Sequence, residues 1–168
     1  MNRLLFAGYA GLALGCAVAD QFIKRLVVDN MQLYERIDLV PMLSLYHTRN
    51  TGIAFSFLSG FNDGVMVILT ACVMIFIGWL ALRTEAHQSI ARVGFAFILG
   101  GALGNIIDRS TLGYVVDYIL FHTETWSFAV FNLADAFISV GAGLVVLQEF
   151  LDWRRGGDQG RSATPPDA

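Results

Sequence analysis

The segment FNLADAF, residues 131–137, opens the last long apolar run of the chain and places Asp135 close to its start. An ionisable side chain at membrane depth is costly unless it faces protein, a partner or water, so such a residue indicates a functional site. A structural role explains the segment equally well, because Asn132 can cap a helix and Asp135 suits the positive end of the helix dipole. The choice between the two depends on the residues that surround Asp135.

The composition of the chain is that of a membrane protein. Hydrophobic residues make up 55% of the 168 residues and charged residues only 15%, and the mean hydropathy is +0.58, which does not suit a soluble globule. The net charge of -3 and the scattered basic residues give no face for binding nucleic acid. Both cysteines lie in apolar runs, which argues against a disulfide, and the three histidines are not clustered, so no zinc site is expected.

Four apolar runs predict four transmembrane helices within a single membrane domain, residues 1–155. We expect these helices at about residues 4–28, 64–83, 90–108 and 131–152. Gly100 and Gly104 are four positions apart in the third run, which favours a close contact with a neighbouring helix. Residues 156–168 are rich in glycine, proline and polar side chains, so we expect a disordered cytoplasmic tail there.

Two segments between the apolar runs leave the lipid core. Residues 29–63 interleave charged positions with short alternating stretches, and Pro41 and the NTG sequence at residues 50–52 are turn signals. This pattern predicts a small β-rich cap outside the membrane. Residues 110–130 contain YVVDYILF, in which apolar and aromatic residues surround Asp117, and we expect this segment at the membrane interface.

Helices joined by turns alternate in direction, so the end of the first, the end of the third and the start of the fourth meet at one membrane face. The other helix ends carry mainly basic residues, which favour the cytoplasm, so we place both termini inside and the acidic face outside. Asp20 and Lys24 are four residues apart, so they can pair on one helical face. Asp108 lies at the unfavourable, negative end of its helix and needs a compensating charge, for which Arg109 is one candidate. The charged residues that converge on this face are Asp20, Lys24, Asp108, Arg109, Asp117 and Asp135.

Asp117 and Asp135, brought together in a poorly solvated place, indicate acid–base chemistry. Two carboxylates a few ångströms apart cannot both ionise cheaply, so one keeps a proton while the other stays ionised. The ionised group can take a proton from a water that attacks a carbonyl, and the protonated group can donate to the carbonyl oxygen, without a cofactor. An acidic pair suits a small proton- or cation-coupled transporter as well, and a non-catalytic assembly factor stays open as a third class.

Five segments carry a family resemblance: DQFIK (residues 20–24), NTGIAFSF (50–57), GGALGNIIDR (100–109), VVDYI (115–119) and FNLADAFI (131–138). Together they resemble the lipoprotein signal peptidase family, also called type II signal peptidase, over about residues 4–150. The resemblance implies an all-α integral membrane protein of the bacterial inner membrane, with four transmembrane helices, an extracytoplasmic β-cradle and a short interfacial helix. It also implies an aspartic endopeptidase that cleaves diacylglyceryl-modified prolipoproteins immediately before the lipidated cysteine.

The resemblance also implies roles for individual residues. The catalytic pair falls on Asp117 and Asp135, with no metal or other cofactor. The expected partners are prolipoprotein substrates, membrane lipids and inhibitors like the cyclic peptide globomycin. Arg49 stands where many relatives would have an aromatic or apolar residue, which bears on substrate preference and not on the chemistry. The residues that match substrate-binding or supporting positions are Asn50, Gly52, Asn105, Asp108, Arg109, Asn132, Ala134, Asp20 and Lys24.

Overall fold

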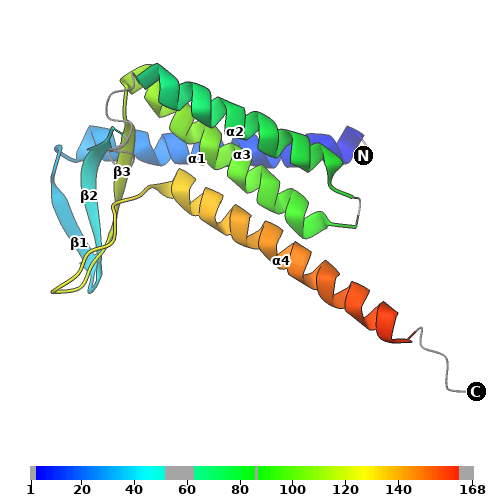
Figure 1. Ribbon diagram of the computed structural model, residues 1–168. Helices are drawn as coiled ribbons and strands as arrows, with labels where there is room; N and C mark the ends of the chain where they lie inside the picture. The colour runs from blue at the N-terminus through cyan, green and yellow to red at the C-terminus, as the bar shows by residue number, and fades with distance from the viewer. Residues whose placement is uncertain (1–2, 52–62, 86, 163–168) are drawn as a thin grey trace, which may run out of the picture.

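The structure is a computed structural model that describes residues 3–51, 63–85 and 87–162 (Figure 1). Gly52 and most of the NTGIAFSF segment lie outside these residues. Within the described ranges the chain forms helices and strands in the following order: α1 (Arg3–Asn30), β1 (Arg36–Val40), β2 (Leu43–Asn50), α2 (Asp63–Arg83), α3 (Ser89–Leu112), β3 (Val115–Phe121) and α4 (Leu133–Ser162).

Three of the helices are long and apolar enough to cross a membrane: the segments Leu4–Asn30, Ser89–Leu112 and Leu133–Arg155. Among the described residues, α2 adds a shorter apolar segment, Val67–Arg83. Many large apolar side chains remain exposed along α1, α2 and α4, as expected of helices whose outer faces meet lipid instead of water. The chain is therefore a mostly helical membrane protein.

Helix α3 is the centre of the bundle, since α1, α2 and α4 all pack against it. Small residues make the close packing possible. A Cβ atom on Gly100 would lie 2.5 Å from the carbonyl oxygen of Ala13 on α1, and one on Gly94 would lie 2.6 Å from that of Gly141 on α4. The predicted close contact at Gly100 and Gly104 is confirmed, and the partner is α1.

The three strands form an antiparallel sheet in the order β1-β2-β3. Strands β1 and β2 fall within the predicted β-rich cap. Strand β3 comes from residues 110–130, which we had expected only to lie at the interface, and it pairs with β2 so that Asp117 lies opposite Thr48. The β-branched and aromatic residues around Asp117 suit a strand, and β3 is buried over most of its length. The predicted short interfacial helix is not found in residues 3–51, 63–85 and 87–162.

The end of α4 differs from the prediction. We expected the fourth helix to end at about residue 152 and the chain to be disordered from residue 156, whereas α4 continues to Ser162. The glycines there lower helix propensity, but extending an existing helix avoids the cost of a new nucleus, so a weak sequence can continue it.

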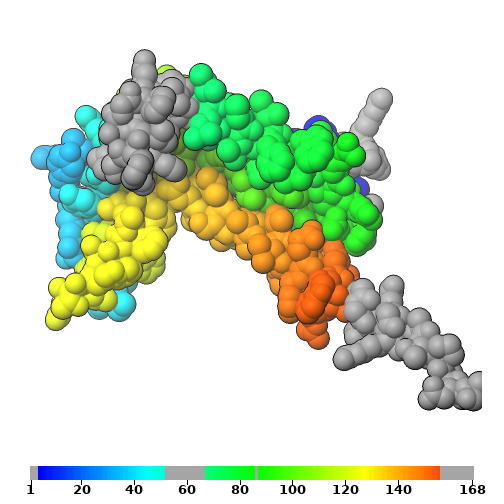
Figure 2. Space-filling model, in the orientation of Figure 1, coloured from blue at the N-terminus to red at the C-terminus, as the bar shows by residue number. Residues whose placement is uncertain are grey.

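The sheet lies at one end of the helices, beside the C-terminal ends of α1 and α3 and the start of α4 (Figure 1). The start of α1, the end of α2, the start of α3 and the C-terminal end of α4 lie at the other end (Figure 1). Figure 2 shows the outline of the molecule as concave between the segment that precedes α4 and the second half of α4. The three helix ends therefore meet as their alternating directions predict, and the sheet joins them there.

Candidate active site

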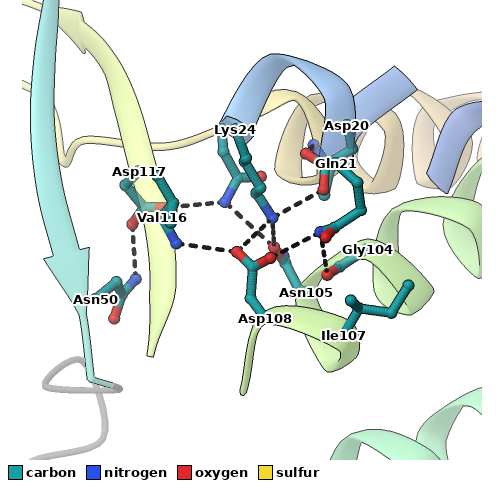
Figure 3. Close-up of polar contacts among 12 residues, drawn as sticks. Asp20, Gln21, Lys24, Asn50, Gly104, Asn105, Ile107, Asp108, Val116 and Asp117 are labelled. Carbon is teal, nitrogen blue, oxygen red and sulfur yellow. Dashed lines mark hydrogen bonds and ion pairs between the residues drawn. The ribbon is translucent and has the colours of Figure 1, made fainter. Parts of the chain in front are cut away.

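Asp117 projects from β3 and is almost fully buried, with 2% of its surface exposed. Each of its carboxylate oxygens accepts a hydrogen bond from an amide. Asn50 Nδ2 on β2 donates to Oδ2 over 2.9 Å (Figure 3). Asn132 Nδ2 donates to Oδ1 over 2.7 Å. The strand pairing and the start of α4 thus hold the carboxylate in one orientation.

The environment of Asp117 makes its proton available near neutral pH. Burial raises the pKa of Asp117 to about 6, the hydrogen bond from Asn50 opposes this rise, and the negative charge of Asp135 adds to it. An ordinary aspartate titrates at about 3.9. A carboxyl with such a raised pKa suits general acid–base catalysis.

Asp135 lies in the first turn of α4 and is half-buried. Asn105 Nδ2 on α3 donates to its Oδ1 over 2.8 Å. The backbone N–H of Asn132 donates to its Oδ2 over 3.2 Å, and Asn132 Oδ1 accepts from the backbone N–H of Asp135 over 3.0 Å. This reciprocal arrangement is a helix cap, so the capping role of Asn132 that the sequence indicated is confirmed.

One amide therefore joins the two acids. The Oδ1 atom of Asn132 caps the turn that carries Asp135, while its Nδ2 atom binds Asp117. Capping and contact with the acidic pair, which the sequence left as alternatives, are here made by the same side chain. Tyr118 supports this junction, because its Oη accepts from the N–H of Leu133 at the start of α4 over 3.2 Å.

Asn105 links the pair to a buried cation. Its Oδ1 accepts from Lys24 Nζ over 2.9 Å and from Asn132 Nδ2 over 3.2 Å. An ammonium group can only donate, so Lys24 fixes which end of the Asn105 amide faces it. The NH₂ end of Asn105 is thereby directed at Asp135.

Lys24 is the centre of a charge cluster in which it is only 3% exposed. Its Nζ lies 2.8 Å from Asp20 Oδ2 and 2.9 Å from Asp108 Oδ2 (Figure 3). The predicted Asp20–Lys24 pair is confirmed. The cation beside Asp108 is Lys24 and not the adjacent Arg109, which points about 100° away around the helix and forms no ion pair with any of the described residues.

The two carboxylates around Lys24 also bind backbone groups. Asp20 Oδ1 accepts from the N–H of buried Ala134 over 2.8 Å, and Asp108 Oδ2 accepts from the N–H of Val116 over 3.0 Å. The cluster thus fixes α1 and α3 to the first turn of α4 and to the strand beside Asp117. A Cβ atom on Gly104 would collide with the Asp20 carboxylate, so the glycine leaves room for this contact.

Sequence reasoning missed Gln21. Its Nε2 donates to Asp108 Oδ1 over 2.7 Å and to the carbonyl oxygen of Gly104 over 3.1 Å. The available signal was its position between Asp20 and Lys24, on the turn that faces α3. Arg49, which departs from the expected residue type, stacks on Tyr114 with its guanidinium carbon 4.7 Å from the ring centroid.

The site therefore contains two carboxylates, one of which has a raised pKa. Amide side chains bind both carboxylates, and a buried cation supports these amides. The arrangement can deprotonate a water and protonate a carbonyl oxygen. In residues 3–51, 63–85 and 87–162 there is no group of three metal-ligating side chains. Gly52 is the predicted site residue that lies outside the described residues.

Comparisons with known proteins agree on one family. A family model described as signal peptidase (SPase) II matches residues 12–151. A protein of Mesorhizobium japonicum named lipoprotein signal peptidase is 56% identical over 147 residues, which cover 88% of each chain. A protein of Brucella ovis with the same name is 54% identical over 136 residues, or 81% of this chain and 85% of the relative.

Two solved structures share the fold. Both are described as bacterial membrane enzymes determined by the in meso method. The first, at 1.9 Å resolution, has a TM-score of 0.76 and 26% identity, and the match covers 84% of this chain and 91% of that one. The second, at 2.3 Å, has a TM-score of 0.77 and covers 96% and 94%, and its 24% identity makes it a likeness of fold alone.

Proposed function

The chain belongs to the signal peptidase II family, and from this we propose that it cleaves the signal peptides of diacylglyceryl-modified prolipoproteins immediately before the lipidated cysteine, with Asp117 and Asp135 as its catalytic pair. That it is a bacterial inner-membrane lipoprotein signal peptidase follows from the family and from relatives at 54–56% identity. The transporter alternative finds no support in these matches. The main support for this catalytic assignment is that the Asn132 side chain contacts both aspartates.

The proposed topology has four spans in a single domain, residues 1–155, with α2 as the span additional to the three apolar helices. Both termini lie in the cytoplasm, and the acids lie near the outer face of the inner membrane. The basic residues near the termini and the α2–α3 connection support this orientation. The acyl chains of a lipidated cysteine lie in the outer leaflet, so the bond beside that cysteine would reach the depth of Asp117 and Asp135.

In the proposed reaction, the ionised carboxylate of the pair takes a proton from a water as the water attacks the scissile carbonyl. The other carboxyl donates its proton to the carbonyl oxygen, which gives a tetrahedral intermediate. As the C–N bond breaks, the proton taken from water passes to the leaving nitrogen and the hydroxyl of the intermediate returns its proton to the pair, so that the amine and the carboxylic acid are released. The pair titrates as a unit, so the proton belongs to the pair and not to one named residue. The raised pKa of Asp117 supports retention of this proton.

The proposed supporting residues divide by what they contact. Asn50, Asn105 and Asn132 orient the carboxylates through their amides. Asp20, Lys24, Asp108 and Ala134 hold the helices in place around them. Arg109 is half-buried and is proposed to bind a carbonyl of the peptide or lipid, and Gly52 to lie near the substrate. A globomycin-like cyclic peptide is proposed to bind between the two aspartates, and membrane lipids to surround the helices.

Cleavage of a synthetic lipobox peptide tests the proposed function. Purified protein in detergent micelles should release the signal-peptide fragment from a peptide whose cysteine carries diacylglycerol, and mass spectrometry should place the cut immediately before that cysteine. The matched control is the same peptide with an unmodified cysteine, which should be cleaved at least about a hundredfold more slowly because it lacks acyl chains to hold it at the site. Equal cleavage of both peptides, or a cut elsewhere, would contradict the proposal.

The pH dependence of cleavage tests the shared proton. Burial raises the pKa of Asp117 to about 6, so the pair is expected to lose its shared proton as pH rises through about that value. Since the reaction needs one proton on the pair, kcat/KM should decrease on the alkaline side as pH rises through about 6, and not through the ordinary aspartate value of about 3.9. Initial rates on the lipidated peptide between about pH 4 and about pH 9 measure this. A rate that is level over that range is the opposing result.

A further inference from the structure

An apolar groove lies on the part of the bundle farthest from the sheet. Helices α1 and α2 both pack against α3 but scarcely against each other in the described part of the chain, so a cavity of about 280 Å³ opens between them. Its walls include Phe6 from α1, Gly78 from α2, and Phe95 and Leu99 from α3. The charged residue in this lining is Arg92 on α3.

Arg92 is a buried cation without a counter-charge. It is 7% exposed, its Nη2 donates to the carbonyl oxygen of Thr84 over 3.0 Å, and its Nε has no hydrogen-bond partner. No carboxylate of the described ranges 3–51, 63–85 and 87–162 forms an ion pair with it. A buried charge without a partner is strongly unfavourable, so the site is suited to an anion.

The start of α3 adds to this positive charge. Arg92 lies in the second turn of α3, whose N-cap residue, Gln88, makes no side-chain capping bond and whose first turn contains no acid. The Asp152 carboxylate on α4, which accepts from Gln88 Nε2 over 3.0 Å, offsets part of the positive end of the helix dipole, and the remainder adds to the charge of the guanidinium. An anion with oxygen acceptors, such as a phosphate, can bind both the guanidinium donors and this field.

The groove beside Arg92 is open space. A Cβ atom added to Gly78 would meet nothing within 4 Å, whereas one on Gly94 or Gly100, on the packed faces of α3, would meet backbone oxygens at 2.6 and 2.5 Å. An occupant must therefore combine an anionic group at Arg92 with an apolar chain beside Phe95 and Leu99. A signal peptide is a poor candidate, because the end of a signal peptide on this side of the membrane is positively charged.

We propose that the α1–α2–α3 groove binds one anionic phospholipid, with its phosphate at Arg92 and an acyl chain between α1 and α2. The lipid comes from the leaflet at the N-terminal end of α1, which is the cytoplasmic leaflet in the proposed orientation. The residues that line the groove come from the first part of α1, the last part of α2 and the first part of α3. These parts lie at the end of the bundle opposite β3, which carries Asp117, and the start of α4, which carries Asp135 (Figure 1). The site is therefore separate from the proteolytic site and does not depend on the proteolytic assignment.

Lipid binding to the purified full chain tests the site. Phosphatidylglycerol and phosphatidylcholine with identical acyl chains are titrated into the protein in detergent, and native mass spectrometry measures the bound fraction. Wild-type protein should bind one phosphatidylglycerol at least about tenfold more tightly than phosphatidylcholine, because the trimethylammonium group of phosphatidylcholine cancels the net charge of the lipid and is repelled by Arg92. Arg92→Gln should remove this preference.

A second variant keeps the test decisive if Arg92→Gln does not fold. Gly78→Leu fills the groove without changing its charge, and it should weaken binding of phosphatidylglycerol by about tenfold or more. Gly143→Leu on α4 is the matched control, because a Cβ there also meets nothing within 4 Å and Gly143 does not line the groove; its binding should equal that of wild type.

Three results would overturn the proposal: equal affinity of the wild-type protein for the two lipids, unchanged binding to Gly78→Leu, or displacement of the lipid by inorganic phosphate alone. The last result would mean that Arg92 binds a free anion and that the apolar groove plays no part. Because the readout is bound lipid, a failed cleavage assay and a failed lipid site give separate outcomes.

Discussion

Asp117→Asn and Asp135→Asn should each reduce kcat/KM on the lipidated peptide by about a thousandfold or more, since general acid–base catalysis contributes about 10² to 10⁴ in rate and both roles belong to this pair. Asparagine keeps the size of the side chain and one acceptor oxygen, so the fold should persist. It can no longer accept a proton from water or share one with its partner. The measurement is initial rate, with circular dichroism to verify that each variant is folded.

The double variant and a remote control separate catalysis from general damage. Asp117→Asn with Asp135→Asn should lose no more activity than either single change, because residues that act as a unit are not additive. Asp38→Asn on β1 removes an exposed carboxylate that binds Arg36 and Ser44, and it should retain full activity. Substantial cleavage by either single catalytic variant would remove the aspartic pair from the mechanism.

Lys24→Met should lower the free energy of unfolding by about 3–5 kcal/mol, as when one partner of a buried ion pair is removed. Methionine has nearly the same length, so the loss is of charge and not of volume. The carboxylates of Asp20 and Asp108 would then remain buried together without a cation. Asn105 would also lose the donor that fixes its amide, so the remaining folded protein should cleave slowly. Unfolding by denaturant in micelles measures the first effect.

Arg25→Met is the matched control. Arg25 and Asp29 have the same spacing on α1 as Asp20 and Lys24, and their charged atoms are 2.7 Å apart, but the side chain of Arg25 is 75% exposed. Water screens such a pair, so its loss should cost less than about 1 kcal/mol. Adding Asp20→Asn and Asp108→Asn to Lys24→Met should recover part of the stability. If Lys24→Met is as mild as Arg25→Met, the buried cluster is not what holds the helix ends together.

The features that could be predicted from the sequence are those that depend on residues close together in the chain. The apolar runs predicted the helices, the four-residue spacing predicted the Asp20–Lys24 pair, and Asn132 was recognised as a cap. Each of these depends on residues within one or two turns of a helix, where spacing fixes direction.

Contacts between distant segments could not be predicted in this way. Nothing local to Asp117 specifies that Thr48 lies opposite it. Pairing between strands is decided by which faces become buried once the helices have assembled. For the same reason the sequence offered the adjacent Arg109 as a compensating charge for Asp108, whereas the cation that pairs with Asp108 is Lys24 on α1. Which cation pairs with Asp108 depends on the tertiary packing that places Lys24 against α3.

Asn132 has a consequence for how the enzyme loses activity on heating. The side chain that caps the first turn of α4 also holds Asp117, and helix ends fray at lower free energy than helix centres. If that turn opens, the two acids separate while the remainder of the bundle stays intact. The activity should therefore be lost at a lower temperature than the helical structure, and cooling should restore the activity.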